Sequence, residues 1–281
     1  MTYGGRERMY LVHVPRSYDP AKRAPLVLVF HGGTRNAAST ERLTGMSDKS
    51  EEEGFIAVYP NGTGRFQRVL VWNVEFGFAY ALRNNVDDVG FIRELVGRLE
   101  RELDIDPKRI FATGISNGGM LSYLVASKLS DLVAAVAPVA GASGGRQYAG
   151  APLIIYPKPK DPVSIIAFNG MADKLVQYNG GQGTGFANAD YVSVPESIGL
   201  WVKYDGCRTT PLHETSASGN IVKDTYPGGK DSTEVVLYTI MNGGHAWPGG
   251  KLPVWANGDA PTSEISATDI MWRFFKDHPK K

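Results

Sequence analysis

The amino-acid sequence predicts an α/β protein with a mostly parallel central sheet and helices on both of its faces. Short runs rich in β-branched residues alternate along the chain with segments in which apolar residues recur at helical spacing. Several of the runs are apolar at every position, which is typical of strands buried on both faces of a sheet. These two observations favour one large core, and we expect residues 1–281 to form a single domain.

The first part of the chain is predicted to contain strands followed by one long helix. Strands are expected at residues 9–14, 25–30 and 55–59. Asp87 and Asp88 then provide a helix N-cap signal, because an aspartate side chain accepts hydrogen bonds from the free amides of a first helical turn. Apolar residues at three- and four-residue spacing follow, and Pro107 is expected to stop the helix.

The rest of the chain continues this alternation. A strand at residues 109–115 leads into a helix over residues 117–129. Further buried strands are expected at residues 134–139, 163–168 and 235–240. A capping box that begins at Ser266 predicts the final helix. Near residues 182–195 and 212–231 the sequence is polar and glycine-rich, which predicts loops or an added hairpin over the core.

Composition and charge exclude several classes of partner. The chain carries 30 Lys and Arg against 29 Asp and Glu, a net charge of +1, so it lacks the basic surplus of a nucleic-acid-binding protein. No apolar stretch approaches the roughly 20 residues of a membrane span. The lone Cys207 cannot form an internal disulfide or a cysteine-based metal site. We therefore expect neither a nucleic-acid nor a membrane partner.

The first residues lack the apolar core of a signal peptide. The expected location is the cytoplasm if Met1 is the native start, and the protein is secreted if a signal peptide was removed. The sequence does not indicate an oligomeric state.

Residues 114–118 match the pattern Gly-x-Ser-x-Gly, in which small neighbours allow a tight turn that raises the serine oxygen above the sheet. The pattern also occurs at residues 141–145, but the context differs. Ser116 has a predicted strand before it and a periodic helix after it, whereas the segment after Ser143 cannot begin such a helix. We therefore predict that Ser116 is a nucleophile and that Ser143 is a loop serine.

A serine nucleophile needs a base to accept its proton and an acid to hold that base, and in this architecture the chain order is serine, acid, histidine. His245 fits the base, since the other histidines precede Ser116 or lie in the polar excursion or the tail. Asp173 fits the acid because it comes just after the strand expected at residues 163–168. The rival acids are Asp161, which precedes that strand, and Asp190 and Asp205, which follow no clear core strand. We predict that Ser116, Asp173 and His245 form a catalytic triad.

Acyl transfer also requires hydrogen-bond donors for the charge that develops on the carbonyl oxygen. One predicted donor is the backbone amide of Asn117, directly after the nucleophile, and the other lies in the turn at residues 31–34. Within that turn we favour the Thr34 amide, with the Gly33 amide as the alternative. His31 is expected to anchor the turn.

Two tryptophans are candidates for substrate contact. Trp247 lies two residues from His245 in a glycine- and proline-rich loop, and Trp72 stands beside Asn73 near the expected cleft. The alternative for both is packing in the core, as for most aromatic residues.

In combination and in this order, the motifs resemble those of the polyhydroxybutyrate depolymerase and feruloyl or acetylxylan esterase branch of the α/β-hydrolases. The resemblance covers nearly the whole chain, through His31-Gly32, Trp72-Asn73, residues 87–92 and 114–118, Asp173, residues 178–181, Gly206-Cys207 and residues 244–249. It implies an α/β-hydrolase fold and a serine esterase without a cofactor or metal. It places nucleophile, acid and base on Ser116, Asp173 and His245. The chain departs from the pattern in having Asn169-Gly170 where His-Gly is more frequent, and a single cysteine.

The loops expected at the carboxyl edge of the sheet are glycine-rich and carry aromatic residues, which favours an open cleft over a deep tunnel. We therefore predict hydrolysis of carboxylic esters of short or aromatic acyl groups, such as feruloyl or acetyl esters, through an acyl-enzyme. A short-chain polyhydroxyalkanoate or other polyester depolymerase is the main alternative. A peptidase and a non-catalytic binding module on the same fold are further alternatives.

Overall fold

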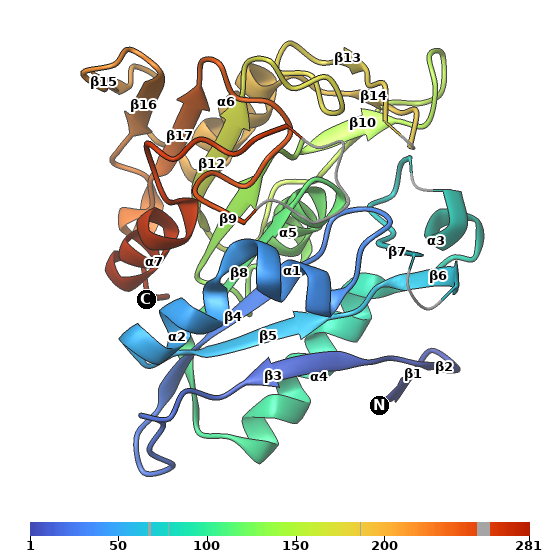
Figure 1. Ribbon diagram of the computed structural model, residues 1–281, viewed down its shortest axis with the longest axis vertical. Coiled ribbons are helices and arrows are strands. Elements are labelled where there is room, and N and C mark those ends of the chain that lie inside the picture. Colours follow the sequence, from blue (N-terminus) through green and yellow to red (C-terminus); the bar gives the residue numbers. More distant parts are fainter. Residues whose placement is uncertain (67–68, 78, 186, 252–258) are drawn as a thin grey trace.

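The computed structural model describes residues 1–66, 69–77, 79–185, 187–251 and 259–281. A nine-stranded sheet runs through the molecule (Figure 1), built in chain order from β3 (Tyr10–His13), β4 (Ala24–Phe30), β5 (Ile56–Pro60), β8 (Ile105–Ile115), β9 (Ala135–Val139), β12 (Ser164–Gly170), β15 (Leu212–Thr215), β16 (Ile221–Tyr226) and β17 (Val235–Ile240). Its spatial order is β15-β16-β17-β12-β9-β8-β4-β5-β3. From β17 to β5 neighbouring strands are parallel, whereas β3, β15 and β16 are antiparallel additions at the edges. The predicted α/β class with a mostly parallel sheet is confirmed.

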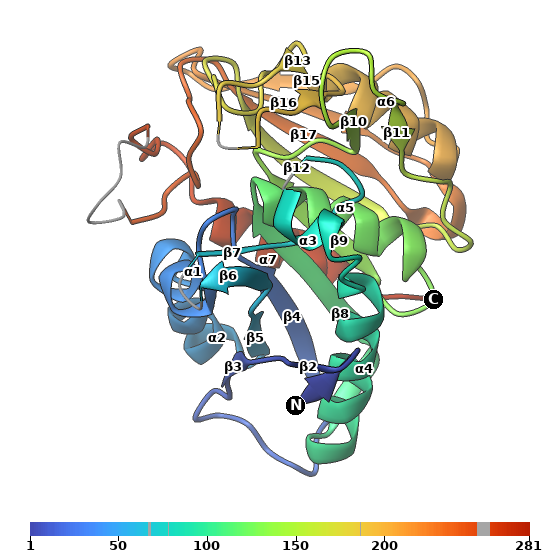
Figure 2. The same ribbon diagram turned by 90° about the vertical axis from the view of Figure 1, so that its right-hand side faces the viewer.

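Helices cover both faces of the sheet (Figure 2). They are α1 (Ala37–Thr44), α2 (Met46–Glu53), α3 (Ala79–Arg83), α4 (Asp88–Glu102), α5 (Asn117–Lys128), α6 (Val194–Asp205) and α7 (Ala267–Asp277), with one 3-10 turn, η1 (Lys230–Ser232). One hydrophobic cluster joins Leu26 and Leu28 of β4 to α4 and α5. A second cluster joins Val27 and Val29 of the same strand to α1 and α7. Because successive residues of a strand point to opposite faces, burial on both faces explains the continuous apolar run of β4.

None of the helices in the described ranges is long and apolar enough to cross a membrane.

Pro107 does not itself stop the helix that precedes it. Helix α4 ends at Glu102, and Pro107 lies within β8. The pairing of β8 with β4 shifts register between Ala24 and Leu26, so residues 106–109 fall outside the regular ladder. A proline is tolerated there because a residue outside the ladder has no hydrogen bond to donate.

The two polar, glycine-rich excursions build additional β-structure. In the excursion at residues 212–231, β15 and β16 form a hairpin that pairs with β17, so the predicted hairpin extends the edge of the sheet and does not lie over the core. Near residues 182–195 the chain contributes to a separate four-stranded sheet. Its strands are β10 (Gly144–Arg146), β11 (Ile154–Ile155), β13 (Gly181–Gln182) and β14 (Asp190–Tyr191). The described residues also include two small two-stranded sheets, β1 (Thr2–Tyr3) with β2 (Arg6–Glu7) and β6 (Thr63–Phe66) with β7 (Val69–Val71).

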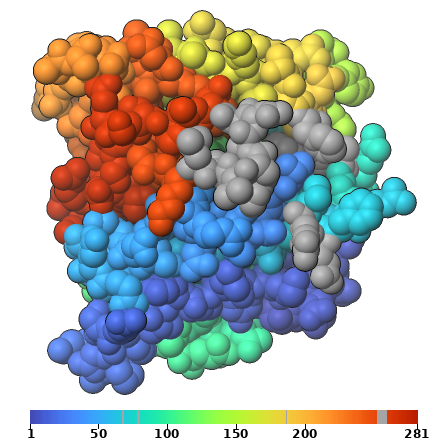
Figure 3. Space-filling model, viewed as in Figure 1, coloured from blue at the N-terminus to red at the C-terminus, as the bar shows by residue number. Residues whose placement is uncertain are grey.

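The C-terminal helix packs against the N-terminal third of the chain. Lys49 of α2 pairs with Asp269 of α7 at 2.5 Å, and Lys276 of α7 pairs with Glu53 at 3.1 Å. On the face shown in Figure 3, the C-terminal segment (red) accordingly lies directly beside the N-terminal segments (blue). Helices α1, α2 and α7 therefore cover the same face of the sheet.

Asp205, the last residue of α6, is an ionisable side chain that the fold buries completely. One carboxylate oxygen accepts a hydrogen bond from the Val163 amide at 3.3 Å, and the other has no hydrogen-bond partner in the described structure. Burial raises the pKa of Asp205 to about 7, and the bond from Val163 opposes this rise. The folded protein therefore keeps the Asp205 proton at pH values at which the unfolded chain has lost it.

Asp205 is expected to lower the stability as the pH rises from about 4 to about 7, because the folded state binds this proton more tightly than the unfolded state over that range. The slope from one such group is at most about 1.4 kcal/mol per pH unit, and it vanishes above pH 7. Asp205→Asn should therefore raise the melting temperature at pH 8 more than at pH 5. Thermal unfolding across this range measures the effect, with Asp277→Asn, an exposed site, as the control. An equal change at both pH values would contradict the prediction.

Candidate active site

The three predicted triad residues lie beyond the carboxyl ends of parallel strands in the main sheet. Ser116 follows β8 directly, Asp173 follows β12, and His245 follows β17. Because β17, β12, β9 and β8 are consecutive parallel neighbours, these three loops emerge at the same edge of the sheet. The fold thus brings together at one edge three residues that are far apart in sequence.

Ser116 occupies a strained turn between β8 and α5. Its backbone angles are φ 59° and ψ −121°, a conformation that L-residues rarely adopt. The flanking glycines are required by space: a Cβ on Gly118 would lie 2.3 Å from the Phe30 carbonyl oxygen, and a Cβ on Gly114 would lie 2.6 Å from the Gly118 backbone. Ser116 remains partly exposed although the residues on either side of it are buried. This is the geometry that the Gly-x-Ser-x-Gly pattern predicts.

His245 and Asp173 form a hydrogen-bonded pair. His245 Nδ1 lies 2.7 Å from Asp173 Oδ2, and the two side chains are 12 % and 1 % exposed. Asp173 Oδ1 accepts hydrogen bonds from the amides of Leu175 and Val176 at 2.8 and 2.9 Å. With Nδ1 donating to this fixed carboxylate, Nε2 is the nitrogen of His245 that can accept a proton. Within the described residues Ser116 Oγ makes no hydrogen bond to His245, a bond that in unliganded enzymes often tightens only when substrate binds.

A second carboxylate holds the His245 loop through its backbone. Asp259 Oδ2 accepts a hydrogen bond from the His245 amide at 2.7 Å. Gly244 has no room for a side chain, since a Cβ there would lie 2.0 Å from the same oxygen. Asp259 is not among the residues predicted from the sequence, because no local pattern marks an exposed aspartate in a loop. Although two carboxylates and an imidazole meet here, no group of three or more His, Cys, Asp or Glu in the described ranges could hold a metal ion.

The two segments predicted to stabilise an oxyanion both adjoin the nucleophile. Asn117 is the first residue of α5, so its amide has no acceptor within the helix. A Cβ on Gly32 would lie 3.6 Å from Ser116 Cβ, which places the turn at residues 31–34 against the nucleophile. Backbone donors from both segments are therefore near the serine.

The Thr34 amide is already engaged. It donates a hydrogen bond to the Leu70 carbonyl oxygen at 2.8 Å. An amide in such a bond cannot also stabilise an oxyanion unless the bond breaks. The sequence-based preference for Thr34 is corrected on this ground, and the alternative, the Gly33 amide, becomes the candidate donor of the turn.

His31 anchors the turn as a neutral, fully buried ring. Its Nε2 accepts a hydrogen bond from the Gly62 amide at 2.9 Å, so Nδ1 carries the proton and donates to the Gly32 carbonyl oxygen at 2.8 Å. Burial lowers the pKa of His31 to about 4, which keeps the ring neutral near pH 7. The predicted structural role of His31 is confirmed.

Neither tryptophan proposed for substrate contact reaches an open cleft. Trp72 is fully buried, and its indole Nε1 donates to the His31 carbonyl oxygen at 2.9 Å. Trp247 is 1 % exposed, and its Nε1 donates to Thr268 Oγ1 at 3.0 Å. Both assignments are therefore corrected to core packing, because a buried ring with a committed N–H has no surface left for a substrate.

The sequence of the chain matches known proteins. A protein-family model described as "Putative esterase" matches residues 2–178. The chain is 29 % identical over 247 residues to "Feruloyl esterase B" of Piromyces equi, a match that covers 87 % of this chain and 44 % of that protein. It is 26 % identical over 257 residues to "Poly(3-hydroxyalkanoate) depolymerase C" of Paucimonas lemoignei, covering 84 % of this chain and 58 % of that protein. The chain thus spans less than two thirds of the length of either relative.

The fold also matches a solved structure, "Acetyl xylan esterase from Aspergillus awamori". The TM-score is 0.63 and the sequence identity 17 %, over 95 % of this chain and 94 % of that one. At 17 % identity the match shows the fold of the chain alone.

Proposed function

The chain belongs to the esterase family and has the α/β-hydrolase fold, and from this premise we propose that it is a serine hydrolase that cleaves carboxylic ester bonds. The observation that carries the proposal is the pair of His245 Nδ1 and Asp173 Oδ2, 2.7 Å apart, at the sheet edge where Ser116 occupies its strained turn. A base held by a buried carboxylate near such a serine is the arrangement that activates a serine hydroxyl.

In the first half of the reaction, Ser116 Oγ attacks the carbonyl carbon of the ester while His245 Nε2 accepts the hydroxyl proton. Asp173 stabilises the imidazolium that forms, through the Nδ1–H hydrogen bond. The amides of Asn117 and Gly33 donate to the oxyanion of the tetrahedral intermediate. When the intermediate collapses, the bond to the alcohol oxygen breaks and His245 returns its proton to that oxygen, which leaves an acyl group on Ser116.

In the second half, a water molecule replaces the alcohol. His245 Nε2 accepts a proton from the water, whose oxygen attacks the acyl carbon, and the same backbone donors stabilise the second tetrahedral intermediate. Its collapse breaks the bond to Ser116 Oγ, which takes the proton back from His245. The carboxylic acid leaves and the free serine is restored.

The preferred substrate class is an ester of a short or aromatic acyl group. We expect kcat/KM to be highest for acetyl, butyryl or feruloyl esters and to fall for octanoyl and decanoyl esters, because glycine-rich loops at the catalytic edge favour an open cleft over a long acyl tunnel. The measurement is a series of p-nitrophenyl esters of increasing chain length together with methyl ferulate. A maximum at the decanoyl ester would contradict the open cleft.

Polyester hydrolysis is the second candidate, supported by the match to a poly(3-hydroxyalkanoate) depolymerase. A hydroxybutyrate oligomer in the same series tests it, since a kcat/KM above that of every aryl ester would favour the depolymerase. A peptide amide cleaved faster than the esters would instead indicate a peptidase. A fluorophosphonate probe that fails to label Ser116 would indicate a binding module without catalysis.

A further inference from the structure

A buried ion pair lies beside the oxyanion segments and takes no part in the chemistry described so far. Arg8 Nη2 lies 2.6 Å from Asp88 Oδ1, and the two side chains are 1 % and 0 % exposed. Asp87 caps α4 as predicted, accepting from the Gly90 amide at 2.8 Å, whereas Asp88 faces Arg8 and does not cap the helix. Desolvation makes a buried ion pair a weak source of stability compared with apolar side chains of similar volume. Its place in the fold therefore suggests a different role.

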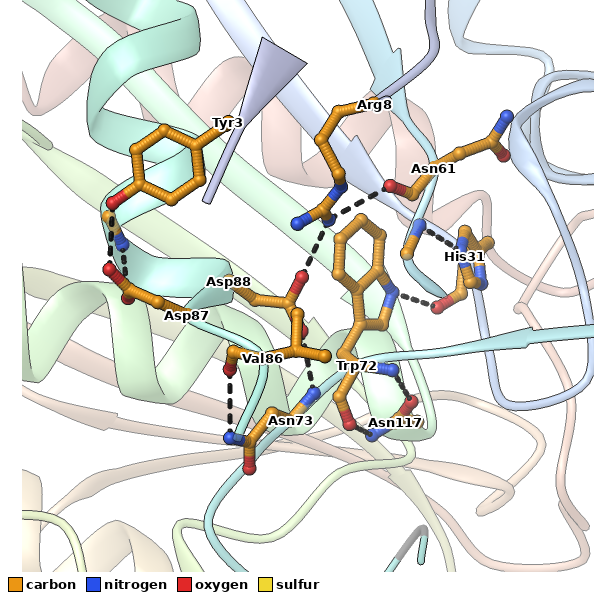
Figure 4. A network of polar contacts seen from close by, with 12 residues as sticks. Tyr3, Arg8, His31, Asn61, Trp72, Asn73, Val86, Asp87, Asp88 and Asn117 are labelled. Atoms are coloured by element: carbon orange, nitrogen blue, oxygen red, sulfur yellow. Dashed lines mark hydrogen bonds and ion pairs between the residues drawn. The ribbon is translucent and has the colours of Figure 1, made fainter. Parts of the chain in front are cut away.

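The second oxygen of Asp88 holds the backbone at residues 72–73. Asp88 Oδ2 accepts a hydrogen bond from the Asn73 amide at 2.8 Å, while Arg8 fixes the carboxylate from the other side (Figure 4). Asn73 Nδ2 donates to the Val86 carbonyl oxygen at 2.9 Å, which ties the same segment to the residues before α4. Burial raises the pKa of the Asp88 carboxyl, and the Arg8 guanidinium opposes this rise.

Trp72, the neighbour of Asn73, contacts both oxyanion segments. Its backbone N–H donates to Asn117 Oδ1 at 2.7 Å, and its carbonyl oxygen accepts from Asn117 Nδ2 at 3.2 Å. Its indole Nε1 donates to the His31 carbonyl oxygen, and its ring stacks on the His31 ring with centroids 4.6 Å apart. Figure 4 shows this continuous chain of contacts from Arg8 through Asp88 to Asn117 and His31.

We propose that Asp88, held by Arg8, is a positioning residue for the oxyanion hole. Through the Asn73 amide it sets the position of the 72–73 backbone, and thereby of the Asn117 and Gly33 amides. The inference rests on the proposed function, because these amides are the donors assigned to the tetrahedral intermediate. Such donors act by being held in place, and a displacement of about 1 Å costs about a hundredfold in rate. The hydrogen bonds from the Asn117 and Gly33 amides to the oxyanion are strongest in the transition state. Misplacing these amides by replacing Asp88 should therefore lower kcat and leave KM nearly unchanged.

Two double variants isolate the hydrogen bond between Asp88 and Asn73. Arg8→Met with Asp88→Asn removes both charges but keeps a carboxamide oxygen for the Asn73 amide. Arg8→Met with Asp88→Leu removes the charges and the acceptor. With p-nitrophenyl acetate, kcat of the leucine version should be roughly tenfold to a hundredfold below that of the asparagine version, with KM values within about twofold. The affinity for a boronic acid, which forms a tetrahedral adduct with the serine, should fall in the same proportion.

Tyr3→Phe is the matched control. It removes a 2.7 Å hydrogen bond to Asp87, the neighbouring aspartate, which makes no bond to the 72–73 backbone, and it should leave kcat unchanged. A purely structural ion pair predicts equal kcat in the two double variants after correction for the folded fraction, and that result would overturn the inference.

If the Arg8→Met, Asp88→Leu variant does not fold, Trp72→Phe tests whether the 72–73 segment positions the oxyanion hole. It keeps a ring against His31 but loses the indole N–H bond, so kcat should fall by about tenfold at constant KM. An unchanged kcat would overturn the role of the 72–73 segment. Ser116→Ala is assayed alongside: activity in that variant would overturn the proposed function itself, whereas an inactive Ser116→Ala with equal double variants overturns the role of Asp88 alone.

Discussion

Ser116→Ala is expected to reduce ester hydrolysis by at least about 10⁴-fold while the protein remains folded. The hydroxyl oxygen is the attacking atom, and without it the backbone donors and the binding cleft leave a background rate; loss of the nucleophile from a serine triad costs up to about 10⁶ in kcat. The fold should persist because the substitution removes one hydroxyl group from a partly exposed side chain. Initial rates with p-nitrophenyl acetate and a thermal melt measure both effects.

Ser143→Ala provides a control within the same sequence pattern. Ser143 stands in the second Gly-x-Ser-x-Gly match, but it precedes strand β10, is buried, and its hydroxyl has no hydrogen-bond partner in the described structure. Its alanine variant should keep full activity and react with a fluorophosphonate, whereas Ser116→Ala should not react. More than about a hundredth of the wild-type rate in Ser116→Ala would mean that another residue is the nucleophile.

Asp173→Asn is expected to lower kcat by about 10⁴-fold through the tautomer of His245. Asp173 Oδ1 accepts from the amides of Leu175 and Val176, so the oxygen of an asparagine must stay on that side. The NH₂ group is then forced toward His245 Nδ1 and donates to it, which moves the ring proton to Nε2. A protonated Nε2 cannot accept the proton of Ser116.

The comparison for Asp173→Asn is Asp161→Asn. Asp161 was a rival acid in the sequence, but its carboxylate pairs with Lys280 at 3.6 Å and is 38 % exposed. This variant should keep its kcat within about twofold, because Asp161 precedes β12 whereas the triad residues follow their strands, and because loss of an exposed ion pair costs little stability. If Asp173→Asn retained more than about a tenth of the wild-type kcat, Asp173 would not be the residue that holds the base.

The fold class and the serine turn could be predicted because both depend on patterns that are local in sequence. A run such as that of β4, apolar at every position, needs burial on both faces, and the structure buries all of it. Gly114 and Gly118 are needed because the backbone approaches itself within one short turn around Ser116. The three triad residues could be expected to meet because loops that follow parallel strands leave the same edge of the sheet.

Helix α6 was missed although the sequence contains a signal for it. Ser193 and Glu196 form a capping box, in which each side chain accepts a hydrogen bond from the backbone amide of the other residue, and Pro195 lies in the first turn. The helix was not predicted because the polar, glycine-rich residues before Ser193 indicated a loop or a hairpin up to residue 195. No sequence signal of this kind predicts that the β15–β16 hairpin lies at the edge of the sheet. Its pairing with β17 depends on which strand of the folded sheet still has an unpaired edge.

Only the tertiary structure decided how individual polar groups are used. From the sequence we favoured the Thr34 amide over the Gly33 amide as an oxyanion donor, but the structure shows that the Thr34 amide donates to the Leu70 carbonyl oxygen. Asp88 looked like a second helix cap, yet its partner Arg8 lies 80 positions away. A hydrogen-bond donor can be committed to one acceptor, and which acceptor comes within about 3 Å is set by the packing of the complete chain. Local patterns therefore determined the class of the fold and the chemistry of its serine turn, while contacts between distant segments determined which amides, rings and carboxylates remain available to act on a substrate.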